Sequence, residues 1–179
     1  MEPHDIQLSK RMSRVLRHAP ESVGIELDAH GWVDLTTLVH ALNRSGRRVT
    51  DNDVIRVVES NDKKRYAIEG GRIRASQGHS IDIDLALDPS TPPDTLWHGT
   101  VGRFLASILT EGLRPGERRH VHLSADPEVA RSVGQRRGKP VILTIAAGAM
   151  SSAGHTFWCS ANGVWLTDHV PAEYLSAAD

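Results

Sequence analysis

The sequence predicts an α+β protein built from two lobes of similar length. Three observations support this class: a proline-rich acidic segment divides the chain, apolar residues recur at helical spacing before it, and short β-like runs dominate after it. The dividing segment covers residues 82–94 and cannot continue a helix past Pro89. We therefore predict lobes at residues 1–81 and 95–179, joined by this linker.

The first lobe is predicted to contain helices followed by a β-hairpin. One helix ends at Pro20, a second has its apolar stripe within residues 35–42 and ends near Asn43 or Gly46, and a third begins at a capping box formed by Thr50 and Asp53. Gly70-Gly71 is a typical turn between two short strands. This order is typical of winged-helix modules, which often present basic residues to nucleic acid. The first helix has its apolar stripe at Leu8, Met12, Val15 and Leu16, and the strands are predicted at residues 65–68 and 72–75.

The second lobe mixes short strands and helices without a regular βαβ alternation. A strand at residues 95–98 is predicted to enter a Gly99-Thr100 turn. Asp126-Pro127 begins a helix that turns Ala130 and Val133 inward. Neither a GxGxxG dinucleotide motif nor a P-loop occurs. Another helix, with its stripe at Phe104, Leu105, Ile108 and Leu109, is expected to end at Gly112, the Asp126 helix at Gly134, and strands are expected at 121–123, 141–145, 156–159 and 164–167.

Composition limits the classes of function. The 179 residues are 39% hydrophobic and 24% charged, with a net charge of −1, which is typical of soluble globular proteins. No apolar run approaches the roughly 20 residues that span a bilayer, and the first residues lack the pattern of a secretion signal. The one cysteine, Cys159, excludes an internal disulfide and a multi-cysteine zinc site. We therefore expect a cytoplasmic protein that does not associate with membranes.

Arginine supplies 17 of the 21 basic residues, and ten histidines are a second excess. Guanidinium groups bind phosphate through planar, two-pronged hydrogen bonds that an ammonium group does not match. A GC-rich genome also enriches arginine, so composition alone is a weak indication of phosphate binding. The positions of these residues in the predicted elements are more informative.

Basic residues gather at the end of the first helix. Arg14 is three residues from Arg17 and four from His18, so the three side chains are predicted to share a face opposite the apolar stripe. Cations at a helix C-terminus are also favourable for stability alone. From spacing alone, the stability interpretation is preferred.

A second basic group lies on the predicted hairpin. Lys63-Lys64-Arg65-Tyr66 enters it, and Arg72 and Arg74 alternate onto one face of its return strand. The following segment, 77–80, is rich in hydrogen-bond donors that suit a phosphate backbone. A nucleic-acid surface and a merely solvated wing both fit this pattern.

Histidines mark the second lobe. His98 precedes Gly99, a glycine that would let a ligand approach the backbone closely. His120 and His122 lie on one strand face at the spacing of a metal-binding pair, but no Asp, Glu or Cys nearby completes a ligand set, so zinc is the weaker alternative. Taken singly, each histidine is more often a packed, hydrogen-bonded residue than a catalyst.

Taken together, these motifs resemble one family, the NAD-dependent RNA 2′-phosphotransferases, over nearly the whole chain. Any one motif is weakly specific, but six in the family's order are strongly so. The departures are His30 for a usual Asp, Tyr66 for a common Phe and Trp97 for a common Tyr, and they leave the polar chemistry intact. The motifs are Ser9-Lys10 with Leu16-Arg17-His18, Lys64-Arg65-Tyr66, Ile73–Ser80, Leu96–Thr100, Arg119–Ser124 and Asn162–Thr167.

The resemblance implies a winged-helix-like RNA-binding lobe and an ADP-ribosyltransferase-like split β-sheet lobe that binds NAD. It implies transfer of an internal 2′-phosphate from RNA, such as spliced tRNA, to NAD as co-substrate, with no metal. No protein partner is implied, and we expect a monomer. The implied catalytic residues are Arg17, His18, Arg65 and Arg119; the NAD-binding residues are His98, Gly99, Thr100, His122, Ser124 and Val164; the RNA-binding residues are Lys64, Arg74, Gln77, Gly78 and His79.

Three other functions are weighed against this one. An enzyme that caps a terminal phosphate with ADP-ribose and stops after the first step would use the same site. A non-catalytic RNA-binding module is disfavoured because the four implied catalytic residues are intact. A metal-dependent phosphatase is disfavoured because the sequence has no clustered carboxylates.

Overall fold

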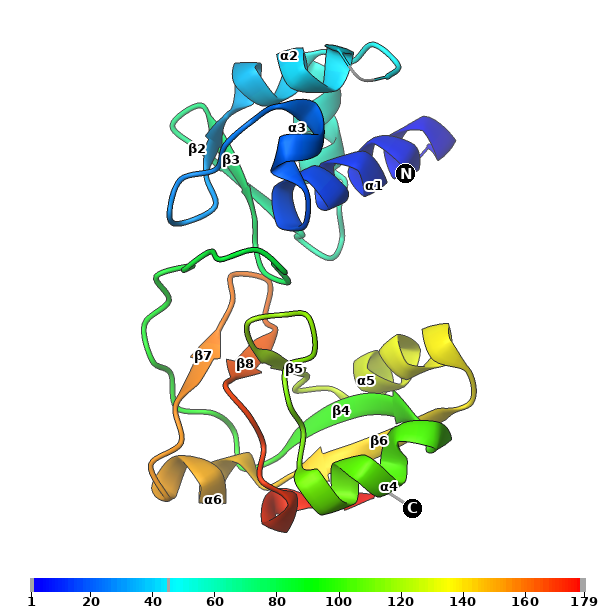
Figure 1. Cartoon of the computed structure of the whole chain (residues 1–179), viewed down its shortest axis with the longest axis vertical. Helices are drawn as coiled ribbons and strands as arrows, with labels where there is room; N and C mark the ends of the chain where they lie inside the picture. Colours follow the sequence, from blue (N-terminus) through cyan, green and yellow to red (C-terminus); the bar gives the residue numbers. More distant parts are fainter. Residues whose placement is uncertain (1, 45, 178–179) are drawn as a thin grey trace. The chain divides into compact units, whose positions relative to one another are not determined.

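The computed structural model describes residues 2–44 and 46–177, and the chain divides into two compact units. Unit 1 is Met1–Ala86 and unit 2 is Leu87–Asp179, and each has its own hydrophobic core. Both combine helices with small antiparallel sheets (Figure 1), as expected for an α+β protein. Within the described ranges, no helix is long and apolar enough to cross a membrane.

Unit 1 has the helices and the hairpin that the sequence predicts. The helices are α1 (Pro3–Arg17), α2 (Leu35–Arg44) and α3 (Asp51–Glu59). The sheet has the antiparallel order β1-β3-β2, with β1 at Val33–Asp34, β3 at Arg72–Ala75 and β2 at Tyr66–Glu69. A short 3₁₀ turn, η1 (Pro20–Val23), follows α1.

Two local predictions in unit 1 are confirmed in detail. The Thr50 hydroxyl accepts a hydrogen bond from the Asp53 N–H at 3.2 Å, and the Asp53 carboxylate accepts one from the Thr50 N–H at 2.9 Å, which completes the capping box. Gly70 and Gly71 have φ angles of 54° and 76° in the hairpin turn. Glycine adopts this left-handed conformation without the steric penalty of a Cβ, so the turn forms where the Gly-Gly pair occurs.

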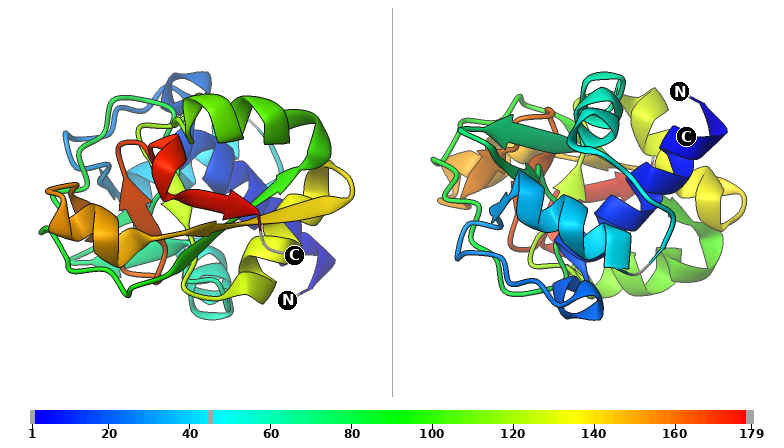
Figure 2. Two further views of the ribbon diagram at one scale, coloured as in Figure 1. Left: turned by 90° about the horizontal axis from the view of Figure 1, so that it is seen from below. Right: turned by 90° about the horizontal axis from the view of Figure 1, so that it is seen from above.

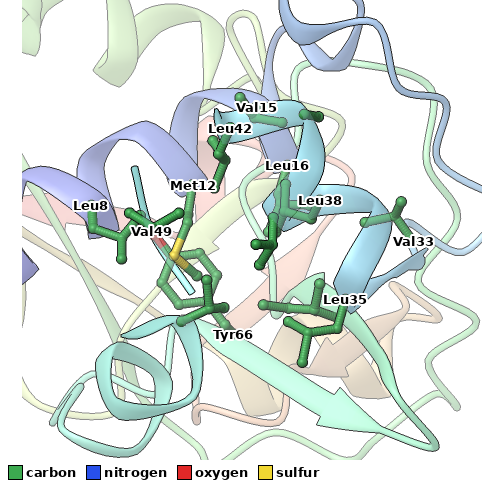
Figure 3. Close-up of a cluster of buried hydrophobic side chains, with 14 of the residues drawn as sticks. Leu8, Met12, Val15, Leu16, Val33, Leu35, Leu38, Leu42, Val49 and Tyr66 are labelled. Atoms are coloured by element: carbon green, nitrogen blue, oxygen red, sulfur yellow. The ribbon is translucent and has the colours of Figure 1, made fainter. Parts of the chain in front are cut away.

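The core of unit 1 forms between α1, α2 and the hairpin (Figure 3). Met12 and Leu16 of α1 and Leu38 and Leu42 of α2 are fully buried, and the Tyr66 ring of β2 packs among them. The helical spacing of apolar residues therefore marks the buried face of α1 correctly.

Unit 2 contains two small sheets joined through one bridge. The first has the antiparallel order β4-β6-β9 and the second β5-β8-β7, and Trp97 and Ser124 pair between them. The elements are β4 (Leu96–Val101), α4 (Gly102–Glu111), β5 (Val121–Leu123), α5 (Pro127–Gly134), η2 (Gln135–Arg137), β6 (Pro140–Ile145), α6 (Ala147–Ser152), β7 (Phe157–Cys159), β8 (Trp165–Thr167), η3 (Ala172–Tyr174) and β9 (Leu175–Ala177).

Helices α4 and α5 pack on the two sides of the β4-β6-β9 sheet (Figure 2). An added Cβ at Gly99 would point into α5. Because side chains alternate along a strand, Leu96 points to the other side, where it joins the core cluster against which Leu105 and Ile108 of α4 pack.

The predicted Gly99-Thr100 turn is wrong. Both residues lie inside β4, where Gly99 pairs with Ile142 and Thr100 with Val141 of β6. A Cβ at Gly99 would stand 1.8 Å from the carbonyl oxygen of Ala130 in α5. Glycine is therefore present because α5 packs directly on the strand backbone, a reason that local sequence does not reveal.

Other predictions in unit 2 hold in part. Gly112 ends α4 with a φ of 82° and Ala130 is buried as predicted, but Val133 is 45% exposed rather than inward. The α5 helix buries a narrow side made of its smallest residues, Ala130 and Gly134, because it packs close to β4. Helix α6 and strands β1 and β9 were not predicted.

Candidate functional site

The C-terminal end of α1 is joined to the segment that follows the hairpin. The Ser80 N–H donates to the Arg17 carbonyl at 2.9 Å, and the Ser80 hydroxyl lies 2.8 Å from Nδ1 of His18. His18 is the residue that caps the helix. Residues 62 positions apart in the sequence, His18 and Ser80, thus meet at one place in unit 1.

The strand that begins the hairpin is held against the same helix end. The Arg65 carbonyl accepts from the Arg17 guanidinium at 3.3 Å and from the Ser76 N–H at 2.9 Å. The Ser76 hydroxyl donates to the Lys64 carbonyl at 2.7 Å, and Lys64 itself has a left-handed φ of 40°. Arg17, His18 and Arg65, three of the residues predicted to be catalytic, therefore belong to one hydrogen-bonded cluster.

The predicted position of Arg17 on the solvent side of α1 is wrong. Arg17 is only 9% exposed, and its guanidinium carbon lies 6.0 Å from the centre of the Tyr66 ring. Tyr66 is in turn fixed by its hydroxyl, which contacts the Ser9 carbonyl. Burial of a guanidinium restricts its motion, so Arg17 presents its hydrogen-bond donors in a defined direction.

Arg72 and Arg74 share a face of the hairpin as predicted, but both contact Trp32. Their guanidinium carbons lie 5.9 Å and 4.6 Å from the Trp32 ring centre. Arg72 also forms an ion pair with Asp28, and Arg74 donates to the carbonyl of His30 at 3.4 Å. Arg74, predicted to bind RNA, therefore has a structural role in unit 1.

His79, another residue predicted to bind RNA, is 4% exposed. Burial lowers its pKa from 6.5 to about 4, with further lowering from the charges of Arg17, His18 and Arg74. A Cβ at Gly31 would stand 3.3 Å from Nε2 of His79, so this glycine makes room for the ring. The neutral ring is a packed part of the cluster.

Buried polar atoms without a hydrogen-bond partner lie beside this cluster. Among the described residues they include Nε2 of His79, Oε1 of Gln77 and Nδ2 of Asn61, the residue whose Oδ1 accepts from Arg65 at 3.4 Å. An unsatisfied buried polar atom is costly, and in native proteins it often indicates a bound water, ion or ligand. Gly78, between Gln77 and His79, is buried, whereas Lys64 is exposed.

Unit 2 brings two of the predicted NAD-binding histidines together. Nδ1 of His98 lies 3.0 Å from the His122 carbonyl oxygen. A carbonyl only accepts, so Nδ1 carries the proton and Nε2 of His98 is left as an acceptor. Burial lowers the pKa of His98 and lowers that of His122 to about 3, so both rings are neutral. In the described ranges, Nε2 of His122 is buried with no partner.

Backbone geometry places the other predicted NAD-binding residues. Ser124 and Trp97 exchange two backbone hydrogen bonds at 2.8 and 2.9 Å, which brings the end of β5 beside the start of β4. The Ser124 hydroxyl accepts from the Asp126 N–H at 3.1 Å. Thr100 is buried in β4, and Val164 is fixed by Ser160, whose hydroxyl accepts from the Val164 N–H at 3.1 Å.

Three arginines near the histidine pair, Arg118, Arg136 and Arg137, were not predicted as site residues from the sequence. Desolvation lowers the pKa of Arg118, and the charges of Arg137 and Arg136 lower it further. The charge of Arg118 also lowers the pKa of both His98 and His122. The paired arginines of the sequence segments 118–119 and 136–137 are the signal that identifies this group, although tertiary structure is needed to bring the segments together.

Arg119 is exposed in the segment before β5. The neighbouring His120 packs its ring at 5.0 Å from the Trp158 ring, and its Nε2 lies 3.7 Å from the Asp168 carboxylate. The carboxylate that local sequence did not offer therefore comes from the end of β8. Within the described ranges, no three His, Cys, Asp or Glu side chains gather as metal ligands.

Comparisons with known proteins assign the chain to a family. Residues 3–169 match the family model described as RNA 2′-phosphotransferase, Tpt1 / KptA family. The chain is 56% identical over 173 residues to a probable RNA 2′-phosphotransferase of Hahella chejuensis, covering 96% of this chain and 93% of that protein. It is 53% identical over 170 residues to a protein of the same name from Streptomyces coelicolor, covering 95% of this chain and 93% of that protein. The chain belongs to the RNA 2′-phosphotransferase family, and the resemblance found in its motifs is confirmed.

Proposed function

We propose that this protein transfers an internal 2′-phosphate from RNA to NAD. In the first step the 2′-phosphate attacks the anomeric carbon of the nicotinamide ribose and expels nicotinamide. In the second step the 2″-hydroxyl of the attached ADP-ribose attacks the phosphorus. The products are RNA with a 2′-hydroxyl and ADP-ribose 1″,2″-cyclic phosphate. Family membership supports phosphate removal from RNA; NAD and the intermediate are our proposal.

The first step needs positioned charge more than proton transfer. A phosphate monoester has a second pKa of about 6 and is mostly dianionic near neutral pH, so it needs no general base. Nicotinamide leaves as a neutral molecule, so it needs no general acid. The task of the protein is to hold two anionic substrates in line, which fixed guanidinium groups do well.

The cluster of Arg17, His18 and Arg65 is the observation that carries this proposal. Arg17 is buried, and its contact with the Arg65 carbonyl ties it to the second arginine, which directly precedes β2. The order of this cluster reduces the reorganisation needed to bind a phosphate. Arg119 is the remaining arginine that we assign to catalysis.

The histidine pair in unit 2 fits a dinucleotide. Because Nδ1 of His98 donates to the His122 carbonyl, Nε2 is a neutral acceptor for a ribose hydroxyl. The partnerless Nε2 of His122 is a second polar atom for a ligand within the described part of unit 2. The positive charge of Arg118, Arg136 and Arg137 around the pair favours the pyrophosphate.

The second step develops negative charge on the phosphorus as a hydroxyl attacks it. Arginines on the phosphate stabilise that charge, whereas the first step only moves existing charge. We therefore expect alanine at Arg17, Arg65 or Arg119 to slow the second step more than the first. Equal slowing of both steps would contradict this assignment.

The decisive experiment combines the protein, NAD and a short RNA with one internal 2′-phosphate, followed by mass analysis of both products. We expect loss of phosphate from the RNA and appearance of ADP-ribose cyclic phosphate. RNA that keeps an ADP-ribosyl phosphate at the end of a long incubation would indicate an enzyme that stops after the first step. No nicotinamide release at all would favour a non-catalytic RNA-binding module.

Variants sharpen this experiment. Arg65→Ala is expected to accumulate the ADP-ribosylated RNA, and Arg103→Ala is the matched control. Arg103 is an exposed arginine of α4 whose guanidinium lies over the Phe104 ring, at 4.8 Å from its centre. Activity that persists in the presence of a metal chelator would exclude the alternative of a metal-dependent phosphatase.

A further inference from the structure

One side of α1 carries two arginines, Arg11 and Arg14, whose role the proposed chemistry does not explain. The residues at positions 4, 7, 11, 14 and 18 follow a spacing of three and four, which places them on one side of the helix. They are His4, Gln7, Arg11, Arg14 and His18, which we call the α1 stripe.

On its own helix, the α1 stripe meets an acidic side chain at its N-terminal end, where the Asp5 carboxylate lies 3.8 Å from Nδ1 of His4. From Ile6 to Arg17 the helix contains no Asp or Glu. The acidic residue in its first turn, Asp5, is buried and bound to Arg56 of α3 at 3.0 Å. Like charges three or four residues apart destabilise a helix by roughly 0.2–0.5 kcal/mol per pair. Favourable placement at the C-terminus accounts for Arg14, whereas Arg11 in mid-helix instead donates to a carbonyl in the last turn of α2.

The N-terminal part of the α1 stripe lines a cavity of about 320 Å³. The cavity lies between α1 and the loop after α2, and its polar lining comes from His4, Gln7, Arg11 and Arg47. The Arg11 guanidinium is fixed there by the carbonyls of Leu42 at 2.7 Å and Arg47 at 3.2 Å. A cavity with a fixed guanidinium and a second arginine at its edge suits an anion of the size of a phosphate.

Arg14 connects this cavity with the candidate phosphate cluster. It is exposed and, within the described ranges, has no salt bridge. The rise of an α-helix places it about 4.5 Å along the axis from Arg11 and about 6 Å from His18. The stripe thus forms a continuous line of donors, about 21 Å long from His4 to His18.

We propose that the α1 stripe, with Arg47, is a binding track for the sugar-phosphate backbone of RNA next to the reacting nucleotide. The inference rests on the proposed function for the identity of the substrate. RNA carries one negative phosphate per nucleotide in a flexible chain, so the spaced guanidinium groups of Arg11, Arg14 and Arg47 match it. The track adds affinity without base contacts and therefore without sequence preference.

The test measures RNA binding without NAD. The probes are a 20-nucleotide RNA and a dinucleotide, each with one internal 2′-phosphate, and the variant is Arg14→Glu with Arg47→Glu. We expect at least a tenfold rise in Kd for the long RNA at 100 mM salt, and less than a twofold change for the dinucleotide. The slope of log K against log salt should flatten by about 0.7 for each lost phosphate contact.

Two controls keep the outcome interpretable. Arg103→Glu makes the same charge change on α4 and should leave the long-RNA Kd within twofold. The double alanine variant, checked by thermal melting, should flatten the salt slope in the same direction without a charge reversal. An unchanged Kd and salt slope for the long RNA, or an equal loss of affinity for both RNAs, would refute the proposed binding track. Absence of phosphate transfer with an intact effect on long-RNA binding would overturn only the proposed chemistry.

Discussion

Replacement of Gly99 by alanine tests the close packing of α5 on β4. The added Cβ would stand 1.8 Å from the Ala130 carbonyl oxygen and 2.7 Å from its carbon. An ordinary C···O contact is about 3.3 Å, so α5 must retreat by roughly 1.5 Å. Both of these neighbours are backbone atoms, which cannot rotate away as a side chain would. We expect a loss at or above the upper end of overpacking, about 3 kcal/mol.

For a unit of this size, a loss of 3 kcal/mol lowers Tm by roughly 12–24 °C. Differential scanning calorimetry of Gly99→Ala measures this shift. The matched control is Gly102→Ala at the start of α4, where an added Cβ meets nothing within 4 Å and Tm should not fall. A Gly99→Ala protein with the wild-type Tm would refute the argument that packing, rather than a bound ligand, requires this glycine.

Three further predictions concern unit 1. The His79 pKa of about 4 lies below its ordinary value of 6.5, so the unfolded chain binds a proton at a higher pH than the folded chain does. The free energy of unfolding should therefore fall by about 3 kcal/mol as the pH drops from 6.5 to 4. Urea titrations should show this pH dependence in the wild type and not in His79→Gln, and parallel pH curves for the two proteins would contradict it. Thr50→Ala removes the hydroxyl of the capping box and should cost about 1 kcal/mol, seen as a lower urea midpoint with unchanged m, whereas Thr36→Ala, exposed on α2, should cost less. Arg74→Ala loses its contact with Trp32 and should lower the free energy of unfolding by about 0.5–1 kcal/mol, seen as a lower urea midpoint, while the salt slope of RNA binding stays unchanged. A flatter slope with an unchanged midpoint would instead support the RNA-binding role.

Local sequence predicted the elements whose causes are local. The period of Leu8, Met12 and Leu16 identifies the buried side of α1, and Thr50 with Asp53 identifies the start of α3. These features depend on residues within one or two turns of each other. They are therefore readable without knowledge of the partner surface.

The arrangement of the candidate site depended on contacts between distant residues. Arg17 follows the apolar stripe by one position, yet it is buried because the Tyr66 ring and the Arg65 carbonyl lie beside it. Arg74 contacts Trp32 across 42 residues of sequence. Local periodicity carries no information on such partners, so it placed Arg17 on the wrong side.

The sequence by itself determined the family, the α+β class and the residue types of the candidate site, because motifs in fixed order and short-range periodicity are properties of the chain. Only the tertiary structure decided that Gly99 lies inside a strand, that His98 is neutral with Nε2 as acceptor, and that Arg11 and Arg47 meet at one cavity. The physical reason is that close packing, desolvation and charge proximity act through space. Each depends on atoms that the fold brings from elsewhere in the sequence.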